Sequence, residues 1–177
     1  MTITLPAPTP AAAPSAALDQ VLRIVIVLFG AIEGILHLSD LSVFSGDITR
    51  IPGTDPEGLM MLTATVLHPL LGFAAVAFAL MKRLRLGIAA LAGLALAQWV
   101  SDVPSIMREG FELTGSAFLN AEGILRTFVQ PVIGAGAMAA AWFNRHLTAA
   151  TLAVILPTLA NAAGITAFAI GVMMYGF

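Results

Sequence analysis

Five long apolar runs, separated by short polar segments, follow one another from residue 18 to the end of the chain. Each run reaches the roughly 20 residues that an α-helix needs to cross a bilayer. The runs predict transmembrane helices over residues 18–44, 57–81, 84–103, 118–143 and 147–175. The expected fold class is therefore an all-α integral membrane protein, with one bundle of five transmembrane helices over residues 18–177.

The segments between the runs predict turns and one longer connection. Residues 104–117 form the longer connection, between the third and fourth runs. Residues 107–113 within it have the pattern of a short interfacial helix. Pro157 predicts a kink in the last helix, because proline cannot donate a backbone hydrogen bond. Residues 1–17 are rich in Ala and Pro and carry no basic residue. We interpret them as an irregular cytoplasmic tail rather than a signal peptide.

Composition supports a membrane protein and excludes several other classes. The chain is 59% hydrophobic and 10% charged, whereas soluble domains average about 25% charged residues. A net charge of -2 argues against a nucleic-acid partner. The chain has no cysteine, so disulfides, thiolate metal sites and iron–sulfur clusters are excluded.

Basic residues predict the orientation in the membrane. If the five runs alternate, five basic residues fall on one side, and the other side keeps only Arg50 and Arg108 with nearby acids. The five are Arg23, Lys82, Arg83, Arg85 and Arg145. The positive-inside rule then places the N-terminus in the cytoplasm and the C-terminus outside, and we expect a bacterial inner membrane.

Small residues recur at the spacing that lets transmembrane helices pack closely. The pairs and triples are Gly30 and Gly34; Ala89, Gly93 and Ala97; Ala160 and Gly164; and Ala167 and Gly171. Such faces predict close helix contacts within the bundle without identifying any partner.

Polar residues within the predicted spans gather between the midplane and the outer face. Glu33, His37 and Asp40 are spaced i, i+4 and i+7, so they share one face of the first helix. His68 in the second run is predicted near mid-membrane. The other members of this outer polar cluster are Gln98, Asp102, Glu122, Arg126, Gln130 and Asn161. Ionisable groups inside a bilayer are costly, so the cluster is a candidate for ligand binding or for fixing helix packing.

A metal site is one hypothesis for this cluster. Glu33, His37, Asp40 and His68 offer the nitrogen and oxygen ligands that zinc, copper and non-haem iron accept. Haem b held by His37 and His68 is a weaker alternative, because the predicted depths of the two residues differ by roughly 6–8 Å at 1.5 Å per residue. For Arg126, the i, i+4 spacing predicts an ion pair with Glu122, and binding of an anionic ligand is the alternative.

No catalytic motif is present, so we expect no catalysis of the chain's own. Leu22-Arg23, Gly30 and His37-Leu38 resemble the opening helix of DoxX-like small membrane proteins, over one of five predicted spans, and no function is transferred from it.

Three function classes follow from these patterns. The leading expectation is an accessory or structural subunit that packs against lipids and against other membrane subunits or copies of itself. The second is a metal-binding or redox subunit, with haem or quinone included. The third is a small transporter or ligand-binding protein with an outward-facing polar pocket.

Overall fold

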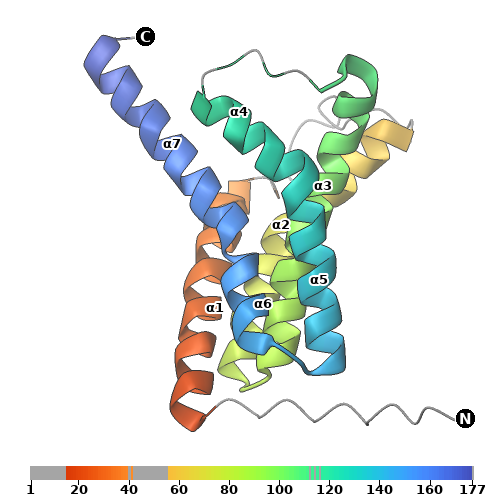
Figure 1. Ribbon diagram of the computed structural model, residues 1–177, viewed down its shortest axis with the longest axis vertical. Coiled ribbons are helices and arrows are strands. Elements are labelled where there is room, and N and C mark those ends of the chain that lie inside the picture. Colours follow the sequence, from red (N-terminus) through yellow and green to blue (C-terminus); the bar gives the residue numbers. More distant parts are fainter. Residues whose placement is uncertain are drawn as a thin grey trace, which may run out of the picture.

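A computed structural model describes most of the chain beyond its N-terminal segment. The described residues are 15–39, 41, 56–111, 113, 115 and 117–176. All regular structure in them is helical (Figure 1). The elements are α1 (Ala16–Leu36), α2 (Pro56–Leu80), α3 (Leu84–Glu109), α4 (Ala117–Ile124), the π-helical turn η3 (Leu125–Val129), α5 (Gln130–Phe143), α6 (Leu147–Val154) and α7 (Leu156–Tyr175).

Four of the five apolar runs form helices long and apolar enough to cross a membrane. They are Gly58–Leu80, Leu84–Glu109, Asn120–Phe143 and Leu147–Met174. The regular structure of the described residues is all-helical, as predicted, and the four apolar helices fit a multi-pass membrane protein by their length and composition. The first run forms α1, whose 21 residues extend about 30 Å. The charged residues Asp19, Arg23 and Glu33 are spread along α1. No membrane-length stretch of α1 is therefore as free of charge as the apolar stretches of the other four helices.

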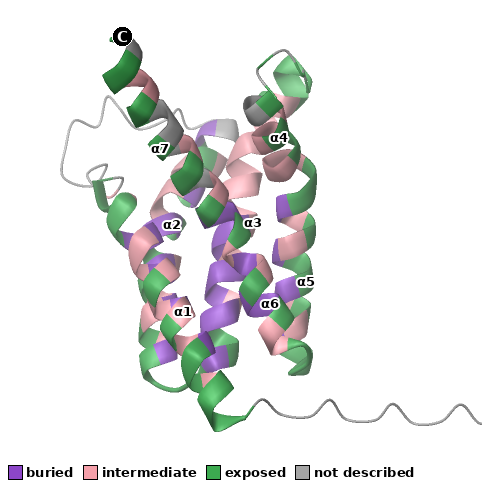
Figure 2. Cartoon of the chain, turned by 60° about the vertical axis from the view of Figure 1, so that its left-hand side comes forward, coloured by how far each residue is buried: buried purple, intermediate pink, exposed green. Residues whose placement is uncertain are grey.

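Consecutive helices pack side by side, with α1 against α2, α2 against α3, α3 against α5, and α5 against α6. Figure 2 shows the buried positions concentrated along α3, at the centre of the bundle. The buried face of α3 is rich in Ala and Gly, which lets neighbouring backbones approach closely. Without water in the bilayer, this close packing replaces the hydrophobic effect as the force between helices.

A close backbone approach occurs where α1 crosses α2. A Cβ atom added at Gly72 would lie 2.7 Å from the backbone nitrogen of Gly34 and 2.9 Å from the carbonyl oxygen of Gly30. These contacts confirm Gly30 and Gly34 as a helix-packing face. By contrast, a Cβ atom at Gly171 would meet nothing within 4 Å among the described residues, so Gly171 makes no such contact there.

Two predicted helix ends are wrong. The first helix was expected to run through residue 44, but α1 ends at Leu36, and His37 is its C-cap. Ser39 and the polar residues after it favour this end, because short polar side chains compete for backbone hydrogen bonds. The third helix was expected to end at Val103, yet α3 continues through Pro104 to Glu109 and ends at Gly110, whose φ is 80°. Residues 107–109 therefore extend α3 instead of forming a separate interfacial helix.

Prolines create the other irregularities of the bundle. The last helix is interrupted at Ile155, just before Pro157, and α7 then leans away from the bundle (Figure 1). Pro131 follows the π-helical turn and cannot donate to the carbonyl oxygen of Thr127. That oxygen accepts a hydrogen bond from the Trp99 indole nitrogen at 3.0 Å instead. The kink predicted at Pro157 is confirmed.

The crossing of α1 and α2 gives a stability prediction. Gly72→Ala should destabilise the protein by about 1–3 kcal/mol, because the added methyl group meets backbone atoms that cannot move aside. Gly136→Ala is the matched control, since its Cβ atom would meet no described residue within 4 Å. Reversible unfolding in detergent micelles measures both. Equal stability of the two variants would contradict the close crossing.

Candidate metal centre

Glu33 is a carboxylate on the packing face of α1. It continues the buried stripe of Leu22, Ile26 and Gly30, and the residue is only 3% exposed. A buried carboxylate without partners would cost several kcal/mol. The neighbouring helices must therefore supply its hydrogen bonds.

His68 of α2 supplies the first of these hydrogen bonds. It lies one helical turn before Gly72, so the close crossing of the two helices brings its ring to Glu33. Nε2 of His68 is 2.6 Å from Oε2 of Glu33, and His68 is 5% exposed. If the carboxylate is ionised, it can only accept hydrogen bonds, and the histidine nitrogen is then the donor.

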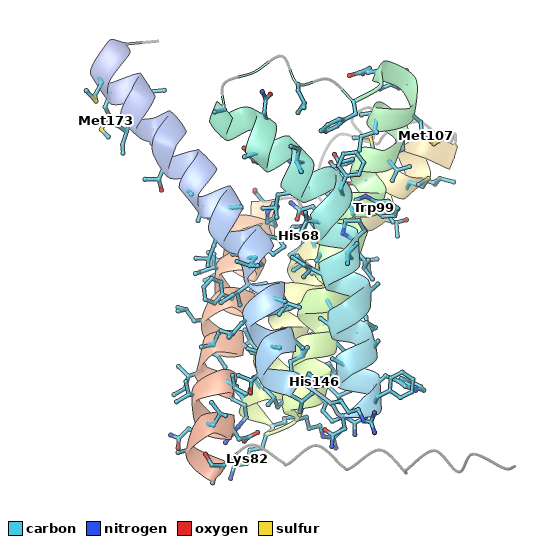
Figure 3. The ribbon with its side chains drawn as sticks, viewed as in Figure 1. His68, Lys82, Trp99, Met107, His146 and Met173 are labelled. Atoms are coloured by element: carbon cyan, nitrogen blue, oxygen red, sulfur yellow. The ribbon has the colours of Figure 1, made fainter. Side chains whose placement is uncertain are left out.

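His37 completes a group of three ligating side chains. As the C-cap of α1, it donates its backbone N–H to the carbonyl oxygen of Glu33 at 3.2 Å, which fixes its position over the last turn. Its Nε2 lies 3.8 Å from Oε2 of Glu33. Its ring stacks on that of His68, with centroids 3.7 Å apart and planes inclined by 35°. Figure 3 shows His68 between the helices, in the half of the molecule away from Lys82 and His146.

Thr158 holds the other oxygen of the Glu33 carboxylate. It lies in the first turn of α7, immediately after the proline break, and its hydroxyl donates to Oε1. One oxygen therefore faces the histidines while the other is fixed by Thr158. Sequence reasoning missed this residue, because 125 positions separate it from Glu33. Its only sequence signal is a hydroxyl directly after the predicted kink at Pro157.

The three side chains have the spacing of a metal-ligand set. One ligating atom each from Glu33, His37 and His68 lies within 4.8 Å of the others. Ligands of one tetrahedral ion with bonds near 2.1 Å lie about 3.4 Å apart, so small side-chain shifts would accommodate an ion. Predicted ligand Asp40 lies outside the described residues.

The haem alternative was weakened in the sequence analysis by a predicted difference in depth between the two histidines, which the structure does not show. His37 and His68 lie at the same level, with stacked rings. A bis-histidine haem needs its two ligand rings on opposite faces of a macrocycle, pointing at the iron. Because the centroids of the two tilted rings are only 3.7 Å apart, there is no room for a porphyrin between them, and the arrangement favours a single ion over haem.

A second polar cluster lies between α3 and the helix formed by α4, η3 and α5. Arg126 pairs with Asp102 at 2.9 Å, so the predicted pair with Glu122 is wrong. Tertiary packing brings Asp102 to the guanidinium, whereas Glu122 faces Gly164 of α7, about 3.6 Å from where a Cβ atom would be. Gln130 is 1% exposed and donates to the Ala95 carbonyl and to the Gln98 side chain, both at 2.9 Å.

This second cluster borders a small cavity. Its walls include Gln98, Glu122, Arg126, Gln130 and Pro157, and its volume of about 10 Å³ holds no more than about one water molecule. Nε of Arg126 is buried without a partner among the described residues. The side chain of Asn161, also predicted in this cluster, lies outside the described part of the chain. The predicted cluster is thus divided between two sites.

Comparison of the chain with models of known families, with curated proteins and with solved structures finds no match. The interpretation of the site therefore depends on its own chemistry.

The ion pair of the second cluster gives a test of the corrected pairing. In a double-mutant cycle, Asp102→Asn and Arg126→Met should couple by up to about 1 kcal/mol, the range for partly exposed pairs. The matched cycle of Glu122→Gln with Arg126→Met should show coupling near zero. Unfolding in micelles measures both cycles. Stronger coupling to Glu122 than to Asp102 would restore the i, i+4 pairing.

Proposed function

We propose that this chain is a multi-pass membrane protein that binds one transition-metal ion through Glu33, His37 and His68. The observation that supports the proposal is the convergence of three ligating atoms from two helices within 4.8 Å. Thr158 is the positioning residue, because it fixes the carboxylate oxygen that faces away from the histidines. Partners of this kind orient metal ligands and commonly change metal affinity by 10–100-fold.

The ligand set favours a borderline dication. Two imidazoles and one carboxylate suit Zn²⁺ and Fe²⁺. Cu²⁺ is also a candidate, because it generally binds nitrogen ligands more tightly. The chain has no thiolate to select softer ions. The Glu33 carboxylate would offset one positive charge of the ion, which reduces the cost of placing it among apolar helices. Three protein ligands leave at least one coordination position for water or a small molecule, which suits a binding or redox role.

We further propose that all five helices cross the membrane, with the N-terminus in the cytoplasm and the C-terminus outside. The support is geometric. The start of α1, the α2–α3 turn and the α5–α6 turn lie at one end of the molecule (Figure 1). Five of the eight Lys and Arg residues belong to this end. In this orientation the metal centre lies in the outer half of a bacterial inner membrane.

The accessory-subunit function remains a second candidate, favoured by α7. This helix leaves the bundle and exposes large apolar side chains at Ile170, Met173 and Met174. Such a helix needs lipid, another subunit or a second copy beside it, and metal binding is compatible with a role in a larger complex. The transporter class receives no specific support, because the cavity beside Arg126 is small.

Metal content tests the proposed function. Wild-type protein, purified without a histidine tag, should bind about one Zn²⁺ or Fe²⁺ per chain by elemental analysis after loading and desalting. Glu33→Gln, His37→Ala and His68→Ala should each weaken binding at least tenfold, because each removes one of three ligands. Thr158→Val should have a smaller effect.

His146→Ala is the matched control, because it changes the third histidine, at the far end of the bundle. It should leave the metal content unchanged. A folded His68→Ala variant that binds metal like the wild type would overturn the proposal. A metal-free wild type that co-purifies with larger membrane subunits would favour the accessory function.

Labelling of single cysteines tests the topology, and the absence of native cysteine makes each label unambiguous. Ser15→Cys and Arg145→Cys should be protected from a membrane-impermeant maleimide in intact cells, whereas Glu109→Cys and Met174→Cys should react. Reaction of Ser15→Cys together with Glu109→Cys, but not Arg145→Cys, would mean that α1 does not cross.

A further inference from the structure

A second site lies at the end of the molecule opposite to the metal centre. A groove of about 1180 Å³ runs between the α2–α3 turn, the end of α5, the start of α6 and the first turn of α1. Its lining includes the basic residues Lys82, Arg83 and Arg85 and several apolar side chains, among them Met138 and Trp142. The groove therefore combines cationic and apolar lining.

The charge at this end is strongly positive. Among the described residues it carries five basic residues, namely Arg23, Lys82, Arg83, Arg85 and Arg145, and one acidic residue, Asp19. Five positive charges minus one negative charge leave +4. The single acid is already paired, since Asp19 Oδ2 lies 2.9 Å from Arg23 Nε. Asp19 also lines the groove, but among the described residues neither Lys82 nor Arg83 forms an ion pair with a carboxylate.

Backbone donors at two helix starts add to this positive field. The N-cap positions of α3 and α6 are Arg83 and His146, and neither makes a side-chain capping hydrogen bond. In contrast, Ser15 caps α1 by accepting from the N–H of Leu18. Uncapped helix starts carry partial positive charge and free N–H groups. A basic side chain at a helix N-terminus is unfavourable unless an anion lies nearby. Helix N-termini are common phosphate-binding sites.

The turns that carry these groups are held rigidly. Lys82 and Asn144 adopt left-handed φ angles of 61° and 54°, and each turn closes with a hydrogen bond from the following residue, Arg83 to Phe78 and Arg145 to Ala140. Arg85 donates to the carbonyl oxygens of Ala141 and Trp142, both at 2.8 Å, and joins α3 to the end of α5. Arg85 is thus occupied, whereas Lys82 and Arg83 are exposed beside the groove.

We infer that this groove binds the phosphate headgroup of an anionic phospholipid. Lys82, Arg83 and the uncapped N–H groups of α3 and α6 contact the phosphate. The apolar lining at Met138 and Trp142 contacts the glycerol and acyl chains, and Trp142, which is 77% exposed, suits the interface between headgroups and hydrocarbon. Basic pockets between transmembrane helices bind anionic headgroups through this chemistry. The inference does not depend on the metal centre.

Lipid retention by the purified, delipidated full chain tests the inference. Native mass spectrometry should show phosphatidylglycerol bound at least tenfold more tightly than zwitterionic phosphatidylcholine. The double variant Lys82→Asn with Arg83→Gln should lose at least tenfold in phosphatidylglycerol affinity. Asn at position 82 tolerates the left-handed backbone and so preserves the turn. Arg108→Gln, compared with Arg83→Gln alone, controls for loss of one charge elsewhere and should bind like the wild type.

Three results would overturn the inference. The first is equal retention of both lipids by the wild type. The second is unchanged phosphatidylglycerol affinity in a folded, monodisperse double variant, which would leave the basic residues only a role in orientation. The third is saturation of the groove by inorganic phosphate at millimolar concentration with displacement of the lipid, which would identify free phosphate as the ligand.

Discussion

The Glu33 carboxylate is the interaction on which the structure depends. It lies on the packing face of α1 and is almost fully buried, and a lone carboxylate in that environment would cost several kcal/mol. Hydrogen bonds to charged groups each contribute about 1.5–3 kcal/mol, so the donors of His68 and Thr158 offset much of this cost. These donors come from α2 and α7. One side chain therefore connects three helices that small-residue packing alone would hold less specifically.

The irregular parts of the helices gather around this carboxylate. α1 ends at its C-cap His37, so the imidazole is placed above the last turn. In α2, Pro69 follows His68 directly, and in the last helix Pro157 precedes Thr158. Each feature interrupts or weakens the regular hydrogen-bond pattern of a helix, at a cost in local stability. All three flank the same polar group, as expected if local strain is retained where it positions a site.

The molecule has two chemically different ends. Both polar clusters lie in the half that holds His68 and Trp99, whereas the opposite end carries the basic turns (Figure 3). Between them the core along α3 is built from Ala, Gly and Leu. Titratable groups do not continue through this apolar core among the described residues, so the structure separates a buried site from a headgroup-level site. The proposed metal and lipid sites therefore lie at opposite ends of this apolar core.

The sequence by itself determined the helical class, the apolar runs, the kink at Pro157 and the shared face of Glu33 and His37, because helical periodicity and proline chemistry are local properties. The tertiary structure alone decided which residues meet across helices. His68 lies level with His37 because the close contact at Gly72 fixes the relative position of α1 and α2 along their axes. Counting residues along the sequence does not give that position. Arg126 pairs with Asp102 rather than with Glu122 for the same reason, because helix packing decides which carboxylate lies beside the guanidinium. Thr158 reaches Glu33 only through the break before α7, a contact that no pattern within one helix encodes.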